Sequence, residues 1–586
     1  MSTVSNEKNN GENFERKFAE SIAQELNTDR MMEDLKVFST LERYTGSADG
    51  EKAADFIVAR MEELGVPVVR EHYDIYRSLP LKAAVEVVSG GREKKYPATP
   101  YVYSGCAADL RAPLVFDGYS ERGGCPQALM EERMAAFRGK IVLTHDNSYR
   151  FACLAKQAGA VGILNIWIAD LAHHGTLGGV WGTPEPDDLM YRYPCIPYAE
   201  VLKSDGEELK SLLQQGEVVV SLNVSMDNSI VTTSMPVATI RGKSDNFVLV
   251  SGHYDSWYEG ITDNAVANVS MLELARALKK HQTELERSVV LAWWSGHSDG
   301  RYAGSTWYYD HHWHELKKHC VAHINMDICG CKGSDLVGFN TSLLEGRKFA
   351  DEFLKEFNSE PPIAPVPMAR FADQTFWGAD VPFAIMPKFS RKVLPGEQTF
   401  YWWHTKQDSL DKVDPDIVLR DSRVIAKLAC IFANARTLPA DFTGFAEIMG
   451  ERLRTMEKSL HGDFDLSGVF PYVDRLKAAL GGLEDALKGR SGTDAAVMAI
   501  AGELTRIAYT YSSPYHQDLA VDAPMFPGLS AAMDQGPENT RPDHYLALKT
   551  LFTRQRNRLT GQIDAVIGKC EDQLLRWRAA DSGLKV

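Results

Sequence analysis

The chain contains 586 residues, of which 44% are hydrophobic and 24% are charged, and both values are typical of globular proteins. This composition excludes a disordered, collagenous or coiled-coil protein, and the length allows about three to five domains. Lys and Arg number 64 against 79 Asp and Glu, which gives a net charge of −15. Because an acidic surface repels phosphate groups, we expect neither nucleic acid nor an anionic membrane as a partner.

The sequence favours a reduced, soluble, cytoplasmic protein. Residues 1–16 are polar and lack the apolar core of a signal peptide. No run approaches the roughly 18 consecutive apolar residues that cross a membrane. The nine cysteines are scattered, and only Cys329 and Cys331 lie close together, which is not a zinc-ribbon spacing.

Helical periodicity opens the chain, within a first segment that we place at residues 13–95. Ala53, Ile57, Met61 and Leu64 fall on one helical face before Gly65 ends the pattern. Two runs of alternating character, residues 68–76 and 83–88, then predict two strands.

Residues 96–228 differ in composition, with short β-runs and many Gly and Pro. A strand over 137–144, a helical stretch and a strand near 159–165 predict a compact βαβ unit. We therefore expect a small β-rich domain inserted at this point of the chain.

Residues 229–440 alternate between strand and helix signals. Apolar runs typical of buried strands occur at 247–251, 288–294, 319–327 and 381–387. Between them, Met271, Leu274, Ala275 and Leu278 form a helical stripe. The pattern predicts an α/β fold with a largely parallel sheet and helices on both faces, formed with residues 13–95.

Residues 441–586 are mostly helical, interrupted by a Gly- and Pro-rich stretch from 512 to 545. Apolar residues recur here at spacings of three and four. The segment is predicted to be a helical packing or dimerisation domain.

Histidine and aspartate residues stand where several of these strands end. His253 ends the strand at 247–251, Asp263 opens the next helix, Asp327 ends a third strand, and His404 follows much later. Alone, each residue is more simply a structural histidine or a helix cap. Together they are a plausible divalent-metal set, because imidazole and carboxylate suit zinc and its neighbours.

Three short motifs surround these residues. They read His253-Tyr254-Asp255-Ser256 with Asp263-Asn264, then Asn325-Met326-Asp327-Ile328-Cys329-Gly330, then His404-Thr405-Lys406-Gln407-Asp408-Ser409-Leu410-Asp411. In this order they resemble the zinc aminopeptidase and carboxypeptidase family that includes bacterial leucyl aminopeptidases, carboxypeptidase Q and glutamate carboxypeptidase II (peptidase family 28). The insert with Gly139-Lys140-Ile141-Val142 resembles the protease-associated domain of larger members, and the helical tail more loosely resembles their dimerisation domain.

The resemblance implies a role for each position. His253 and Asp327 would bind one metal ion, Asp263 would bridge two ions, and His404 would bind the second. Asp255 would orient His253, as carboxylates often do for metal-bound histidines. The implied cofactor is a divalent transition metal, zinc first, with one or two ions, and the implied assembly is a homodimer.

The sequence departs from the family at its second motif, which normally carries two consecutive glutamates, a general base and a ligand of the second ion. Here His297 stands at the base position and Ser298 at the ligand position. Asp299 comes one residue late, and the loop before Gly304 is one residue longer.

Three interpretations of this change stay open. In the first, His297 is the general base, because an imidazole pKa near 6.5 suits that role at neutral pH, and Asp299 or a solvent molecule completes the second metal site. In the second, His297 is itself a metal ligand. In the third, the site is a relic, as in the transferrin receptor, although retention of four ligand positions argues against this.

Several aromatic residues precede His404 in the sequence. Tyr401 is a candidate donor to an oxyanion because it is close to His404 in the sequence. Phe376, Trp377, Tyr401, Trp402 and Trp403 either wall a substrate pocket or are ordinary core aromatics.

The leading hypothesis is a metal-dependent hydrolase that acts on an amide bond of a peptide or small amino-acid conjugate, with His297 in the general-base position. Two alternatives remain. One is a metal-dependent lyase or other non-peptidase enzyme on the same fold. The other is a non-catalytic, peptidase-like binding protein.

Overall fold

A computed structural model of the chain describes residues 15–89, 93–122, 125, 129–359, 364–391 and 400–583. The predicted outer domain limits at residues 13 and 586 lie outside this part. The N-terminal helical region is three helices: residues 15–25, α2 (Thr28–Phe38) and α3 (Ala48–Glu63). The side chains of Asn27 and Ser47 accept hydrogen bonds from the first turns of α2 and α3, so each helix begins at a capping residue.

Four parallel strands form the centre of the sheet. They are β9 (Arg287–Trp294), β8 (Ser244–His253), β10 (Cys320–Asn325) and β13 (Phe383–Ser390), in that order. Beyond β13 the sheet continues through β11 (Leu336–Thr341), which is antiparallel, and the short β12 (Val366–Pro367). The predicted mixed, largely parallel sheet is confirmed.

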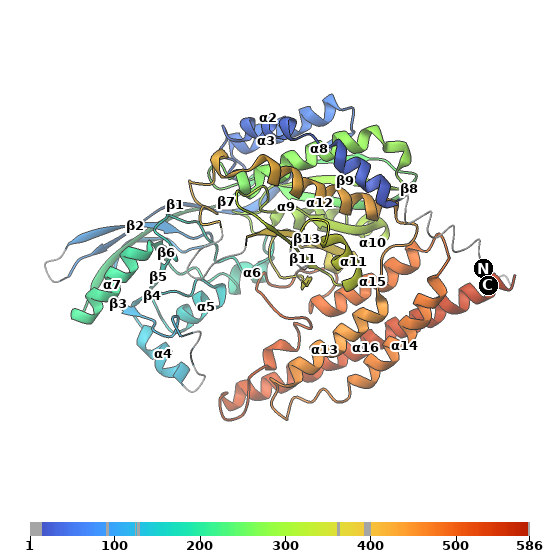
Figure 1. Cartoon of the computed structure of the whole chain (residues 1–586). Helices are drawn as coiled ribbons and strands as arrows, with labels where there is room; N and C mark the ends of the chain where they lie inside the picture. The colour runs from blue at the N-terminus through green and yellow to red at the C-terminus, as the bar shows by residue number, and fades with distance from the viewer. Residues whose placement is uncertain are drawn as a thin grey trace.

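Helices cover both faces of this sheet (Figure 1). On one face Val248 and Val250 pack in the core formed with α8 (Val266–Lys280), α12 (Pro415–Asn434), α2 and α3. On the other, Phe247 and Leu249 pack against α9 (Ala303–His311) and α10 (Trp313–His319). Adjacent side chains of a strand point to opposite faces, so a run that is apolar throughout fits burial on both sides, as predicted.

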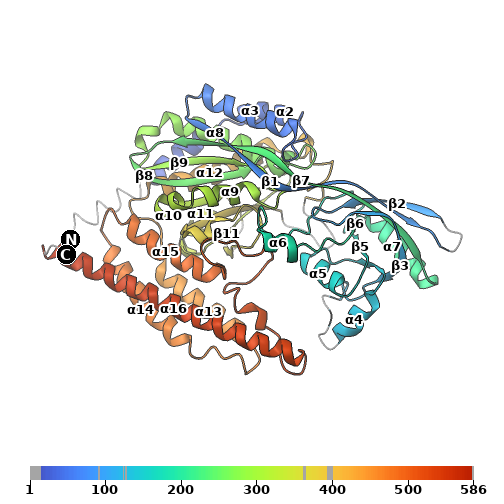
Figure 2. The same cartoon turned by 180° about the vertical axis from the view of Figure 1, so that it is seen from behind.

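Two long strands connect this sheet to the β-rich part of the chain (Figure 2). β1 (Val68–Val87) and β7 (Val219–Ile240) pair antiparallel, with a register shift between Pro80 and Lys82. The two strands predicted at 68–76 and 83–88 are therefore one strand. The prediction failed because Pro80 reads as a break, whereas a bulge accommodates a residue that has no N–H to donate.

The β-rich part closes on itself. Its strands are β2 (Lys94–Pro100), β3 (Ala107–Phe116), β4 (Ile141–Thr144), β5 (Gly162–Ile166) and β6 (Tyr198–Val201). Its helices are α4 (Met130–Phe137), α5 (Tyr149–Gln157), α6 (Pro186–Tyr191) and α7 (Lys203–Gln215). The pairings run from β1 through β2, β6, β5, β4 and β3 to β7, which returns to β1. The unit β4–α5–β5 is the βαβ unit that the sequence predicts.

The C-terminal region is helical, as predicted. It contains α13 (Phe442–Glu457), α14 (Phe470–Leu487), α15 (Asp494–Tyr509) and α16 (Pro542–Asp581). Leu476 and Leu480 of α14 share a buried core with Ile563 and Val566 of α16. Among the described helices, none is both long enough and apolar enough to cross a membrane. The exact domain limits remain predictions.

A buried carboxylate lies between β11 and α11 (Gly346–Leu354). Glu345 is 3% exposed, and neither of its carboxylate oxygens has a hydrogen-bond partner. Burial raises the pKa of Glu345 to about 7, because the ionised form loses its hydration.

Replacing this group should change the pH dependence of stability. Between a pH of about 4.3, the pKa of an unfolded glutamate, and the pKa of Glu345 in the folded chain, the folded chain holds a proton that the unfolded chain has lost. The stability of the wild type therefore falls as pH rises through this range. Glu345→Gln should raise the free energy of unfolding by about 3 kcal/mol at pH 8 and give no such gain at pH 4. Urea unfolding at both pH values measures this. The exposed control Glu457→Gln should show no difference, and an equal gain at both pH values for Glu345→Gln would contradict the argument.

Candidate metal centre

The ends of the four central strands bring the predicted site residues together. His253 ends β8, His297 follows β9, Asp327 follows β10, and His404 lies in the segment after β13. These strands are parallel, so their carboxyl ends share one edge of the sheet, where open α/β sheets bind ligands.

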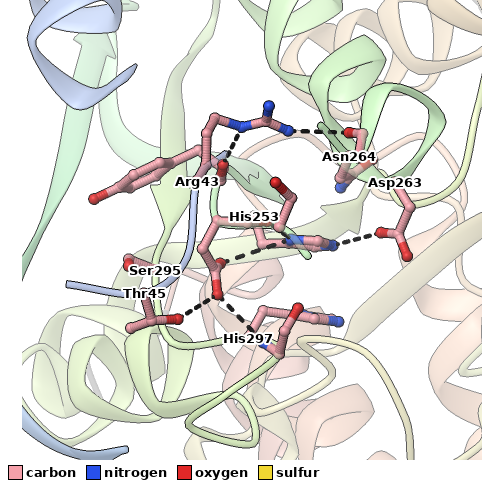
Figure 3. A network of polar contacts seen from close by, with 12 residues as sticks. Arg43, Thr45, His253, Asp263, Asn264, Ser295 and His297 are labelled. Atoms are coloured by element: carbon pink, nitrogen blue, oxygen red, sulfur yellow. Dashed lines mark hydrogen bonds and ion pairs between the residues drawn. The ribbon is translucent and has the colours of Figure 1, made fainter. Parts of the chain in front are cut away.

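Asp263 lies between two histidines. His253 Nε2 is 3.0 Å from Asp263 Oδ1, and His404 Nε2 is 3.1 Å from Asp263 Oδ2. His253 Nε2 is also 3.4 Å from Asp327 Oδ1, an oxygen that has no hydrogen-bond partner. Figure 3 shows the Asp263 carboxylate facing the His253 ring. The four predicted ligand positions therefore converge on one small volume.

Backbone carbonyls fix the tautomers of both histidines. His253 Nδ1 donates to the carbonyl of Asp255 at 2.8 Å, and His404 Nδ1 donates to the carbonyl of His174 at 3.0 Å. With its proton on Nδ1, each ring presents the lone pair of Nε2 to Asp263, the arrangement that metal-binding histidines use. His174 belongs to the β-rich insert, so the insert completes the site, which the sequence did not suggest.

Asp255 supports His253 differently from the prediction. Its carboxylate Oδ1 is 3.7 Å from His253 Nδ1. His253 Nδ1 is therefore closer to the backbone carbonyl of Asp255 than to the Asp255 carboxylate. The other oxygen, Oδ2, accepts from Thr45 Oγ1 at 2.7 Å and from the Ser298 N–H at 3.3 Å. The Asp255 carboxylate thus connects the segment after His253 to the loop that carries His297.

The charges of the cluster suit a cation. Burial would lower the pKa of His253, but contacts with Asp255, Asp263 and Asp327 outweigh it and raise that pKa well above its usual range. Burial alone would raise the pKa of Asp263, but His253 and His404 hold it well below its usual value. Two carboxylates and two imidazoles converging in a buried volume are a donor set that fits a divalent transition metal.

Asp408 positions Asp263 and was not assigned a role from the sequence. Its carboxylate accepts hydrogen bonds from the N–H and hydroxyl of Thr262, at 2.9 and 2.8 Å, and from the Asp263 N–H at 3.0 Å. Burial raises the pKa of Asp408 to about 7. Its place in the third motif was the available signal.

Arg43 anchors the segment between His253 and Asp263. It is fully buried and donates to the carbonyls of Tyr254, Glu259 and Gly260 at 2.8, 2.6 and 3.0 Å. Figure 3 shows its guanidinium above the His253 ring. Burial lowers the pKa of Arg43 to about 10, so the side chain remains charged at neutral pH and holds this loop to the N-terminal region.

His297 lies against His253 and is held by an aspartate. The two rings stack with centroids 3.7 Å apart and an angle of 11° between their planes. His297 Nδ1 lies 2.8 Å from Asp373 Oδ2, and Asp373 Oδ1 accepts from the Ser305 hydroxyl at 2.7 Å. One ring nitrogen of His297 is within 4.8 Å of ligand atoms of His253 and Asp327. Asp373 lies outside every motif, so the sequence offered no signal for its role.

Two other predicted residues lie away from this cluster. Asp299 is fully buried and accepts a hydrogen bond from the Trp257 indole N–H at 2.7 Å, and burial raises the pKa of Asp299 to about 7. Tyr401 is 45% exposed and is not among the described residues that line the site cavity. Its nearness to His404 in the sequence therefore does not bring its side chain to the site cavity.

A cavity of about 580 Å³ opens onto the cluster. Asp263, Asp327, His297 and His404 line one part of it. Its aromatic wall consists of Tyr101, Trp167, Trp257, Tyr302, Phe371, Phe389, Phe400 and Trp403. Of the five aromatics considered from the sequence, Trp403 lines the cavity, whereas Phe376, Trp377 and Trp402 are buried in the packing around it.

Known proteins match this part of the chain. Residues 237–429 match the model of peptidase family M28. A probable leucine aminopeptidase 2 from Arthroderma benhamiae is 29% identical over 301 residues, which cover 49% of this chain and 54% of that protein. The chain thus spans about half the length of this curated relative.

Solved structures show the same fold. A peptidase M28 precursor from Shewanella amazonensis superimposes with a TM-score of 0.57 and 20% identity, covering 72% of this chain and 98% of its own. A zinc aminopeptidase from Bacillus subtilis gives a TM-score of 0.53 and 19% identity, covering 70% and 95%. The aminopeptidase-like fold expected from the sequence is confirmed.

The cluster predicts specific effects on metal binding. Asp263→Asn should abolish tight zinc binding, and Asp408→Asn should weaken it about 10- to 100-fold, because Asp408 orients a ligand rather than serving as one. Calorimetric titration and elemental analysis of the full chain measure affinity and stoichiometry. The matched control Asp411→Asn, whose side chain is 68% exposed on the same loop, should bind like wild type. Wild-type zinc affinity in Asp263→Asn would contradict the assignment.

Proposed function

We propose that the chain, whose residues 237–429 match the model of peptidase family M28, is a metal-dependent hydrolase acting on an amide bond of a peptide or small amino-acid conjugate. The observation that carries the proposal is the convergence of His253, Asp263, Asp327 and His404 at the strand ends, beside a cavity with His297 in its wall. The leucine aminopeptidase relative supports the same reaction class.

We propose zinc as the metal. His253 and Asp327 would hold one ion, His404 a second, and Asp263 would contact both, because its two oxygens face different imidazoles. The second position has fewer ligands than the first, since Ser298 is a poor ligand when neutral. When bound, zinc would polarise the substrate carbonyl and activate a water molecule for attack.

His297 is proposed as the general base. Its Nδ1–H donates to Asp373, which leaves Nε2 unprotonated and able to accept a proton. Asp373, in turn held by Ser305, fixes both the tautomer and the direction of the ring, as an aspartate does for histidine bases elsewhere. The contact between the His297 and His253 rings supports a role for His297 beside the cluster.

Residues 96–228 are proposed to be a protease-associated-like insert, because their strands form one β-rich body that β1 closes and the His174 carbonyl accepts from His404. Residues 441–586 are proposed to mediate a homodimer, since Leu546 and Leu575 of α16 are 66% and 60% exposed. Light scattering of the full chain tests the dimer, and a mass near 65.2 kDa would contradict it.

The reaction class can be tested by following oxygen. In water enriched in oxygen-18, a hydrolase should place one labelled oxygen in the new carboxylate of each cleaved amide. A lyase would instead give an unsaturated product without added water. Mass spectrometry of products from N-benzoyl amino acids and dipeptides distinguishes the two, and an unlabelled, unsaturated product would overturn hydrolysis.

Removing the proposed base should separate catalysis from metal binding. His297→Ala should lower kcat about 10²- to 10⁴-fold, the usual contribution of a general base, while zinc content stays at the wild-type level. Asp373→Asn should lower kcat in the same direction, because an amide no longer fixes the tautomer. The exposed control His314→Ala should change neither quantity. Loss of zinc together with activity in His297→Ala would mean that His297 is a ligand.

A further inference from the structure

The cavity has an uneven distribution of charge. Among its described lining residues the carboxylates are Asp263 and Asp327 alone, and both are proposed to hold metal. The basic groups outside the cluster are Arg301, Lys388 and His173. Once metal neutralises the two carboxylates, the charge left on the wall is positive.

Arg301 has hydrogen-bonding capacity that the protein does not use. Its Nη2 donates to the Ala520 carbonyl at 3.0 Å, and its guanidinium lies 4.8 Å from the centre of the Tyr302 ring. Its Nε–H is buried and has no hydrogen-bond partner. No carboxylate of the described residues lies within ion-pair distance of Arg301, although buried donors normally have acceptors.

Lys388 extends from β13 into the same cavity and is exposed there. Within the described part of the chain it makes no ion pair with a carboxylate. An ammonium on a flexible stem at a cavity wall can follow an anionic group of variable position. Arg301 and Lys388 therefore supply one fixed and one adaptable cation.

His173 adds a third polar group from the insert. It is 3% exposed and stacks on Trp167 with ring centroids 3.7 Å apart. Its Nδ1 is 3.3 Å from Glu200 Oε1, and neither ring nitrogen has a hydrogen-bond partner. Glu200 does not itself line the cavity among the described residues, so its carboxylate supports the ring without presenting negative charge to a substrate.

Among the described residues, the same wall offers no free carboxylate for a substrate ammonium. A free amino terminus in a closed site needs a carboxylate partner, and the two carboxylates here are already engaged by the cluster. Ser298 stands where a glutamate would have added a third, and Asp299 is turned to Trp257. The described part of the wall therefore favours an anion over a cation.

We propose that this site selects amide substrates that carry a free carboxylate, which Arg301 and Lys388 receive, and that it discriminates against substrates with a free amino terminus. The inference rests on the proposed hydrolase function and specifies its substrate class. Two sources of the carboxylate share this chemistry: the α-carboxylate of the released amino acid and a carboxylate on its side chain.

Four benzoyl and leucyl compounds separate these cases with the zinc-loaded full chain. N-benzoyl-leucine carries an α-carboxylate, N-benzoyl-4-aminobutyrate carries only the side-chain type, and N-(3-methylbutyl)benzamide carries none. Leucyl-p-nitroanilide carries a free amine. We expect kcat/KM at least about tenfold higher for one of the two carboxylates than for the neutral amide, the usual effect of one charge-assisted hydrogen bond. The preferred carboxylate identifies the source.

Variants test the residues. Arg301→Gln and Lys388→Gln should each reduce the preference for carboxylate over neutral amide about tenfold, mainly through KM, and Arg301→Lys should recover part of it. The control Lys318→Gln, an exposed cation on α10, should leave the preference unchanged. Neutral amide or leucyl-p-nitroanilide cleaved as fast as both carboxylates would overturn the proposal while leaving the hydrolase intact.

Binding distinguishes this failure from a failure of the hydrolase itself. Calorimetry of N-benzoyl-leucine and N-(3-methylbutyl)benzamide requires no turnover. If N-benzoyl-leucine binds more tightly than the neutral amide, and Arg301→Gln weakens its binding, carboxylate selection is supported even if no compound is cleaved. The lack of cleavage would then count against the hydrolase function alone. Equal binding of the two compounds, or a preference that neither variant changes, would overturn carboxylate selection.

Discussion

The structure depends on one carboxylate that two histidines share. Asp263 presents its oxygens to His253 and His404 at 3.0 and 3.1 Å, and each histidine is fixed from behind by a backbone carbonyl. Nothing in this arrangement tolerates a change of tautomer or a shift of the Asp263 backbone, which Asp408 holds through hydrogen bonds to Thr262 and Asp263. Burial makes these contacts strong, because water does not compete for them.

The β-rich insert helps to fix the position of His404. The carbonyl that fixes His404 comes from His174, and the His174 N–H donates back to the His404 carbonyl at 3.1 Å. His173 and Trp167 of the same insert line the cavity. β1 and β7 run through both parts of the chain (Figure 2). They therefore connect the sheet that carries His253 to the insert that supports His404.

His297, which the sequence comparison with the family places at a glutamate position, is held by contacts from another loop. A histidine needs a partner on Nδ1 to present a defined Nε2, and Asp373 provides it from another loop, with Ser305 behind it. The ring is further confined between Asp373 and the plane of His253. Such support favours a working residue over a relic, because a relic has no need of an oriented imidazole.

The sequence alone determined the fold class, the strand ends and four of the residues that converge there, because buried strands and helix stripes are local patterns and parallel strands end at a common edge. Only the tertiary structure decided which neighbours act on those residues. Asp373, Asp408 and the carbonyl of His174 reach the cluster through contacts between segments far apart in the chain, and no spacing encodes such contacts. The same folding turned Asp299 toward Trp257 and left Tyr401 at the surface, although both lie next to site residues in sequence.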